Sequence, residues 1–75
     1  MLKIGDTITL ESKYSEQVEN YRCKLVEKKG DRLFIDYPIN TKSGRTTFLL
    51  DGTQLKASFV GRDNSIYFFE TEILG

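Results

Sequence analysis

The stretch that decides the fold is residues 21–38, "YRCKLVEKKGDRLFIDYP". Apolar and polar residues alternate on both sides of the Gly30-Asp31 pair, and such a period of two is typical of strands with one buried face. Gly-Asp favours a tight hairpin turn, because glycine adopts positive φ without strain. Pro38 ends the second strand, since it cannot donate to a ladder. The sequence predicts an antiparallel hairpin whose inward residues are Tyr21, Cys23, Leu25, Leu33, Ile35 and Tyr37.

Four further segments have strand character. Residues 13–20 are interpreted as a connection, in preference to a short helix over residues 14–21. The segment 3–12 places Ile4, Ile8 and Leu10 on one face, and the segment 53–61 places Leu55, Ala57 and Phe59 inward. Turn-forming residues separate the other three, which are residues 45–50, 53–61 and 65–74. Six evenly spaced strands predict an all-β fold, a small six-stranded antiparallel split β-barrel that is closed or nearly closed.

The size and composition of the chain narrow the range of possible functions. The chain has 75 residues, which predicts one domain over residues 1–75 with a thin core and no room for a deep substrate cleft. Eleven basic and eleven acidic residues give zero net charge, whereas nucleic-acid binders usually have a basic excess. The one cysteine cannot form an intrachain disulfide, which fits a reducing compartment. With no signal peptide and no apolar run of about 20 residues, we expect a cytoplasmic protein without membrane insertion.

Catalytic chemistry is sparse. The chain has no histidine, so it lacks the usual general base and the commonest metal ligand. We expect no catalytic residue, no metal site and no enzyme activity. Cys23 is at an inward strand position and is interpreted as a buried structural thiol. Four aspartates next to turns are interpreted as turn-forming acceptors: Asp31, Asp36, Asp51 and Asp63.

Basic residues flank the first hairpin, namely Arg22, Lys24, Lys28, Lys29 and Arg32. They could form a positive ridge that contacts nucleic acid or an acidic protein. Interleaved acidic residues favour a mixed, solvated face instead. The prediction that Tyr21, Tyr37 and Phe48 point inward also argues against base stacking on surface aromatics.

Several predicted strands carry apolar residues on both faces. Either β-bulges redirect these side chains into the core, or the second face docks on a partner domain. The candidate partner interface is Val26, Phe34, Val60 and, from one face of residues 66–69, Phe68.

Residues 36–40, "DYPIN", and residues 45–73, "RTTFLLDGTQLKASFVGRDNSIYFFETEI", resemble the N-terminal (PilZN) domain of YcgR-like flagellar brake proteins. The resemblance implies a six-stranded split barrel followed by a PilZ domain that binds cyclic di-GMP at the domain junction. It implies a regulatory domain that modulates flagellar motility, with its own PilZ domain and flagellar motor or switch proteins as partners. The chain stops directly after its last predicted strand, which suggests a domain boundary.

The nucleotide-binding motifs of PilZ proteins are incomplete in this chain. No Arg-x-x-x-Arg is present, and Phe68 stands where the second motif, begun by residues 63–65, requires glycine. We therefore expect no cofactor in this chain and cyclic di-GMP only with the downstream domain. Asn40 and Arg45 are candidates for the interdomain or ligand junction, against the alternative of a loop held by Pro38 and Gly44. Two other functions stay open: a free-standing barrel that binds single-stranded nucleic acid, and a fragment of a flavin-binding split barrel.

Overall fold

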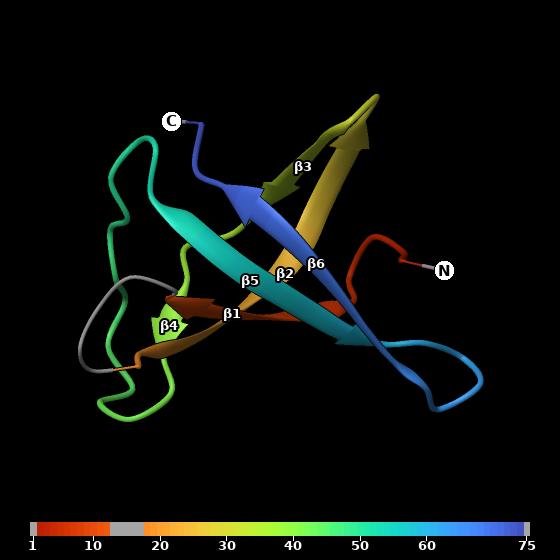
Figure 1. Ribbon diagram of the computed structural model, residues 1–75, viewed down its shortest axis with the longest axis horizontal. Coiled ribbons are helices and arrows are strands. Elements are labelled where there is room, and N and C mark those ends of the chain that lie inside the picture. Colours follow the sequence, from red (N-terminus) through yellow and green to blue (C-terminus); the bar gives the residue numbers. More distant parts are fainter. Residues whose placement is uncertain (1, 13–17, 75) are drawn as a thin grey trace.

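The computed structural model describes residues 2–12 and 18–74, which form six strands and no helix (Figure 1). The strands are β1 (Thr7–Ser12), β2 (Asn20–Lys29), β3 (Arg32–Ile35), β4 (Ile39–Asn40), β5 (Gln54–Val60) and β6 (Ile66–Glu72). Every pairing is antiparallel, and the strand order is β3-β2-β1-β5-β6. The short β4 pairs with β2 beyond the end of β3. The prediction for residues 13–17 of the connection lies outside the described residues.

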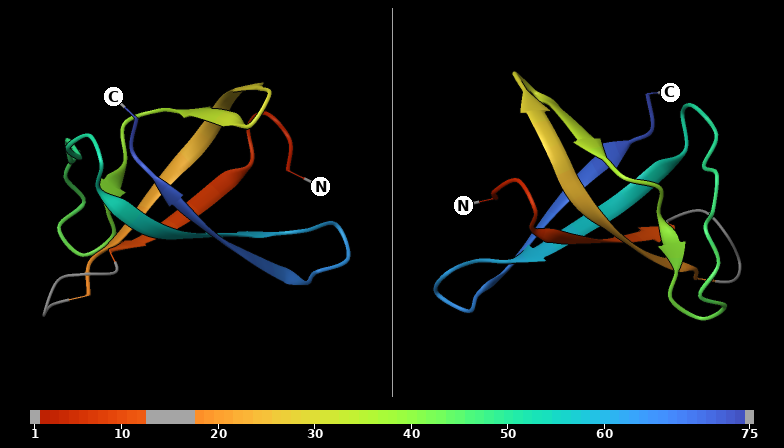
Figure 2. Two further views of the ribbon diagram at one scale, coloured as in Figure 1. Left: turned by 45° about the horizontal axis from the view of Figure 1, so that its top comes forward. Right: turned by 180° about the vertical axis from the view of Figure 1, so that it is seen from behind.

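The sheet curls into a half-barrel, with the long strands crossing at steep angles (Figures 1 and 2). Its two edges, β3 and β6, do not contact each other, so the curl stays open between them. The predicted all-β split barrel is confirmed, whereas the expectation that it is closed or nearly closed is wrong, because β3 and β6 do not meet. The barrel is split along the β3 and β6 edges, and both edges are available for contacts with other molecules.

The core lies on one face of β1, β2 and β5. The register places Ile8 opposite Cys23, and Leu10 opposite both Tyr21 and Ala57. With Leu25 and Leu55 these side chains form the buried cluster, so the inward positions predicted for these seven residues are confirmed, whereas Phe59 near the end of β5 is only partly buried. Burial of each large side chain contributes about 1.5–3 kcal/mol. Ile4, predicted to be inward, is exposed because the chain turns at Gly5 (φ 95°) before β1 begins.

The strand predicted over residues 45–50 is wrong. Only Thr46 makes a bridge, to Ile39, and the place beside β2 belongs to β4. Asn40 N donates to Arg45 O (2.9 Å) and Thr47 N donates to Pro38 O (2.8 Å). Residues 48–50 continue without a strand partner among the described residues.

The inward orientation predicted for Tyr37 and Phe48 is also wrong. Both rings are exposed and pack edge to face with their centroids 5.2 Å apart. β3 ends at Ile35, the alternation breaks there, and Pro38 instead of Tyr37 is buried. Asp36 still holds this segment to β2, because Lys24 N donates to Asp36 Oδ1 (2.7 Å) and Asp36 N donates to Lys24 O (3.1 Å).

Candidate interaction surfaces

Asn40 is the anchor of the loop that follows β4. Its Oδ1 accepts hydrogen bonds from Lys42 N (2.9 Å) and Ser43 N (3.1 Å), and its Nδ2 donates to Glu19 Oε2 (2.8 Å). Gly44, with φ at 73°, donates to Asn40 O (2.8 Å) and closes the turn. Both ends of the Asn40 amide are therefore used inside the chain, so its role in a junction would be to shape the loop.

Arg45 lies at the end of the same loop, and its side chain is exposed. Its backbone is held by Ser43 Oγ, which accepts from Arg45 N (3.2 Å). The structure thus brings Asn40 and Arg45 into one loop and places the planar, five-donor guanidinium of Arg45 on an exposed residue of that loop.

The four candidate interface residues are all exposed, but they form two separate pairs. Val26 and Phe34 lie on β2 and β3, where a β-bulge between Leu25 and Glu27 sets two residues of β2 opposite Phe34. Val60 and Phe68 lie on β5 and β6, on the other side of β1. One of the expected bulges is therefore present, yet it leaves Val26 exposed.

The register shows how the outer face of the sheet is built around Val60 and Phe68. Phe68 is opposite Ser58, which is opposite Thr9, and Val60 is opposite Ile66. Lys56 Nζ lies 4.8 Å from the centre of the Phe68 ring, a cation–π contact. This end of the outer face is apolar, and its middle carries hydroxyl groups.

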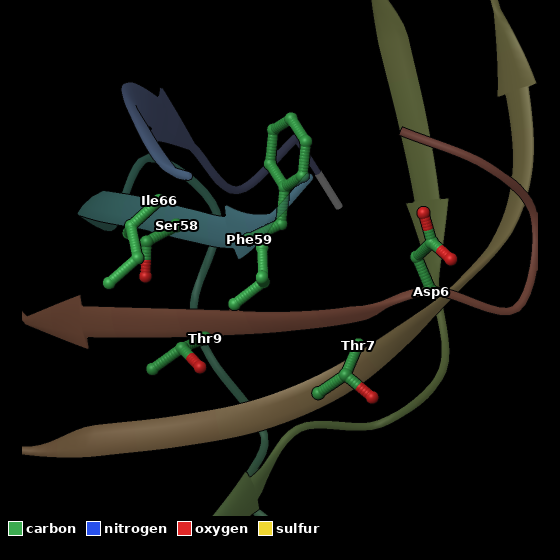
Figure 3. Close-up of a pocket in the computed structure, with 7 residues that line it drawn as sticks. Asp6, Thr7, Thr9, Ser58, Phe59 and Ile66 are labelled. Carbon is green, nitrogen blue, oxygen red and sulfur yellow. The ribbon is translucent and has the colours of Figure 1, made fainter. Parts of the chain in front are cut away.

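A shallow pocket of about 340 Å³ lies between β1 and the β5–β6 hairpin (Figure 3). Figure 3 shows Thr7 and Thr9 along β1, with Ser58 and Phe59 on β5 and Ile66 on β6. Hydroxyl and apolar groups dominate the lining, which Asp6 and Val60 complete. The one carboxylate of the lining, that of Asp6, accepts a hydrogen bond from Lys3 N (2.8 Å), and the shallow shape of the pocket fits a contact surface.

Sequence reasoning missed the most exposed apolar surface, which we call the aromatic surface. It consists of Tyr37, Ile39, Phe48 and Leu50, and Phe48 and Leu50 are 74% and 80% exposed. The Ile39–Thr46 bridge and the Thr47–Pro38 hydrogen bond hold its two segments side by side. The signal was present in the sequence, since the unpaired "RTTFLL" segment carries three large apolar residues.

The titratable groups follow ordinary structural roles. Cys23 is 3% exposed, its Sγ donates to Ile8 O (3.7 Å), and burial followed by the nearby Asp36 charge raises its thiol pKa to about 11. The interpretation as a buried structural thiol is confirmed. Asp63 accepts from Ser65 N (3.1 Å) and from Tyr67 Oη (2.9 Å), and these bonds lower its pKa. Within residues 2–12 and 18–74, no group of three acidic, cysteine or histidine side chains could hold a metal ion.

The turn-former interpretation holds for Asp63, whereas the side chain of Asp36 bonds across to β2. The basic residues of the first hairpin are all exposed, as either of their two interpretations requires. In the described part of the chain, no helix is long and apolar enough to cross a membrane.

The comparison with known families decides what kind of domain carries these surfaces. The PilZNR family model, described as flagellar protein YcgR, matches residues 3–75. The chain belongs to the PilZNR family. The predicted resemblance to a YcgR N-terminal domain is thereby confirmed.

Two relatives from Bacillus subtilis are similar to this PilZNR chain. The uncharacterized protein YpfA of strain 168 is 31% identical over 75 residues, which cover all of this chain and 35% of YpfA. The solved structure of the inhibitor of motility MotI/DgrA superposes with a TM-score of 0.88 at 30% identity, over 99% of this chain and 35% of that one. The PilZNR chain thus spans about a third of the length of both relatives.

Proposed function

We propose that this PilZNR chain is a non-catalytic regulatory domain of a protein that controls flagellar motility. The observation that carries the proposal is the family match over residues 3–75, joined to the similarity with a protein described as an inhibitor of motility. The site geometry supports the non-catalytic part, because the exposed features are apolar surfaces and scattered arginine side chains. Such features bind partners, whereas catalysis needs a nucleophile or base with an orienting neighbour.

The finer proposal is that a PilZ domain follows this domain and binds cyclic di-GMP at the junction between the two. Two observations support it: the relatives are about three times longer than this chain, and the chain has isolated arginines without an Arg-x-x-x-Arg motif. Bidentate arginine forks are the usual clamps for phosphates. The chain by itself would therefore bind the nucleotide weakly, and its partners would be its own PilZ domain and cytoplasmic motor or switch proteins.

The aromatic surface is the best site for the contact with the PilZ domain. Leu50 lies two residues before Gly52, whose N donates to Ile73 O (2.7 Å), so the end of the chain runs beside this surface. A domain joined beyond Ile73 would therefore start near the Leu50 end of this surface. Apolar side chains as exposed as these gain the most from being covered by a neighbouring domain.

The coding DNA beyond the Gly75 codon tests the two-domain proposal. We expect an Arg-x-x-x-Arg linker and a second β-barrel to follow. A stop codon at that place would contradict it, and the domain would then act alone.

Arg45 tests whether this domain contributes to the nucleotide junction. In the whole protein, Arg45→Ala is expected to weaken cyclic di-GMP binding, measured by isothermal titration calorimetry. Arg62→Ala is the matched control, because Arg62 is an exposed arginine in the turn of the β5–β6 hairpin. If the two variants bind the nucleotide equally well, Arg45 serves only its loop.

A second function, binding of single-stranded nucleic acid, is favoured by one observation. Tyr37 and Phe48 are exposed, and Arg22 is paired opposite Ile39 beside them. Exposed aromatic rings near cations can stack bases. Fluorescence anisotropy with a labelled oligonucleotide would show salt-dependent binding if this function is real. No binding at low salt would exclude it.

A further inference from the structure

The β5–β6 hairpin projects from the sheet as an arm, which we define as residues 59–67. The last residue pair between β1 and β5 joins Thr9 to Ser58, so the arm extends beyond the pairing with β1 (Figures 1 and 2). Both faces of the arm are apolar: Val60 and Ile66 are on the outer face, and Phe59 and Tyr67 stack on the other at 5.3 Å. A two-stranded ribbon is only marginally stable in water, so a partner would stabilise it.

The free edge of β6 presents unpaired backbone groups at alternate residues. Gly61 N donates to Ser65 O (2.8 Å) and Ile73 N donates to Thr53 O (3.0 Å), so odd-numbered residues of this segment bond toward β5. The even-numbered residues therefore direct their N–H and C=O groups away from β5. Of the described strands, none lies on that side.

The two edges of the sheet differ in how well they are protected. β3 has four residues, starts with Arg32, and lies opposite the bulge at Val26. β6 has seven residues and pairs with β5 in a continuous register, and residues 66–69 are all apolar. Charges, bulges and short length are the devices that prevent edge pairing. The first four residues of β6 carry none of them.

We propose that β6 pairs antiparallel with β6 of a second copy of this chain, about a two-fold axis at Phe68. In this register Phe68 is opposite the partner's Phe68, Tyr67 is opposite the partner's Phe69, and Ile66 is opposite the partner's Glu70. The backbone N–H and C=O groups of residues 66, 68 and 70 face the free edge. In this register they lie opposite the same groups of the partner strand, so each copy can hydrogen-bond to the other. Aromatic cross-strand pairs form on both faces.

The charge pattern of β6 favours a second copy of this chain as the partner, and it favours a register centred on Phe68. The first half of the strand is apolar, and the acidic residues Glu70 and Glu72 are in the second half. An antiparallel pair centred on Phe68 joins aromatic residues at its centre, keeps the glutamates of the two copies from lying opposite each other, and sends the acidic ends in opposite directions. A shift of the axis to Glu70 would set like charges opposite each other, and a parallel pair would align them along the whole strand.

Concentration-dependent association of the 75-residue chain tests the proposal. A short strand pair buries less than the roughly 1,600 Å² of a standard interface, so we expect a weak dimer with a dissociation constant on the order of 100 μM. Analytical ultracentrifugation of the wild-type chain should show a monomer–dimer equilibrium. A strictly monomeric chain at about 1 mM, roughly ten times that constant, would overturn the proposal and leave the edge to a strand from another protein.

Two matched variants locate the interface. Phe68→Lys places a charge on the free edge and should weaken dimerisation at least about tenfold, whereas Phe34→Lys makes the same change on the β3 edge and should leave it unaltered. Both side chains are exposed, so both variants should keep the wild-type circular dichroism spectrum. Equal dimerisation of Phe68→Lys and the wild type would refute pairing through β6.

A cysteine pair tests the register. Hydrogen-bonded antiparallel partners have Cα atoms about 5.5 Å apart, within the range that a disulfide spans. Phe68→Cys should therefore form a disulfide-linked dimer under mild oxidation, while Phe34→Cys stays largely monomeric. Cys23 does not interfere, because it is buried and its thiol pKa is raised to about 11. Equal cross-linking of both variants would contradict the register.

Discussion

Gly61 should be required only because the Tyr67 ring packs on it. A Cβ at residue 61 would overlap Tyr67 Cε2 and would lie 3.0 Å from Asp63 Oδ1. Gly61 does not adopt positive φ, so its backbone conformation is open to any residue. The alanine methyl group would push the Tyr67 ring away from Phe59, against which it stacks at 5.3 Å.

The size of the stability change in Gly61→Ala follows from the interactions that the Tyr67 ring loses. An aromatic pair contributes about 0.5–1.5 kcal/mol, and an off-rotamer side chain costs about 0.5–1.5 kcal/mol. Replacing glycine by alanine in an unstrained conformation stabilises by about 0.4–1 kcal/mol through the unfolded chain. Gly61→Ala should therefore lower the free energy of unfolding by about 0.5–2 kcal/mol in the wild type. In a Tyr67→Ala background the same change should raise it by about 0.4–1 kcal/mol.

Urea denaturation of the four proteins in this double-mutant cycle measures the coupling. With an m value of about 1 kcal/mol/M, the effect of Gly61→Ala on the midpoint should differ by about 1 M or more between the two backgrounds. An equal loss of stability in both backgrounds would refute the reasoning, because the close approach to Tyr67 would then not be the cause.

Four further predictions concern the core and the loops. Leu25 is 1% exposed, so Leu25→Ala should lower the free energy of unfolding by about 2–5 kcal/mol, a large part of the stability of a small domain. Thermal denaturation measures this change, and a loss below about 1 kcal/mol would contradict the place of Leu25 in the core. The pKa of the Cys23 thiol is about 11 in the folded chain, above its usual 9.0. The neutral thiol therefore contributes its full stabilisation below pH 9, and this stabilisation is lost as the pH rises from 9 to 11. Burial also raises the pKa of Tyr21, so the ionisation of Tyr21 adds to the loss of stability at high pH. Asp36→Asn should lower the Cys23 pKa while leaving it above 9.0, measured by the pH dependence of thiol alkylation, and an unchanged profile would argue against the carboxylate's part. Asn40→Ala removes the hydrogen bonds at both ends of the Asn40 amide and should lower the free energy of unfolding by about 1–2 kcal/mol. Thr41→Ala is the milder control, because it loses one exposed hydrogen bond. Equal losses of stability in the two variants would contradict the role of Asn40 as the anchor of the loop.

The alternation of apolar and polar residues predicted the strand segments in which one face is buried. Tyr21 to Leu25 and Leu55 to Ala57 are such segments, and their inward positions were predicted correctly. The hairpin turn at Gly30 was predicted for the same local reason, the positive φ that glycine allows.

The errors arise where pairing over a distance decides the structure. The segment 45–50 has strand propensity, but β4 already occupies the edge of β2 beside it, and this competition is not visible in the local sequence. Once residues 36–38 leave the strand alternation, Tyr37 and Phe48 pack on each other outside the core. The place of Asn40 and Arg45 in one loop could be predicted from the sequence, and their role at a domain junction stays a prediction. The division of the four apolar candidates into two pairs, and the aromatic surface, could not be seen from the sequence.

The swimming halo of the bacterium that encodes the protein tests the central claim most directly. Higher expression of the whole gene should shrink the halo, and the double variant Tyr37→Ser/Phe48→Ser, made at an equal protein level, should restore most of its diameter. Ile4→Ser/Val18→Ser serves as the control, because both residues are exposed and belong to none of the candidate surfaces, and it should still shrink the halo. A halo that stays the same size with and without the wild-type protein would contradict a role in motility.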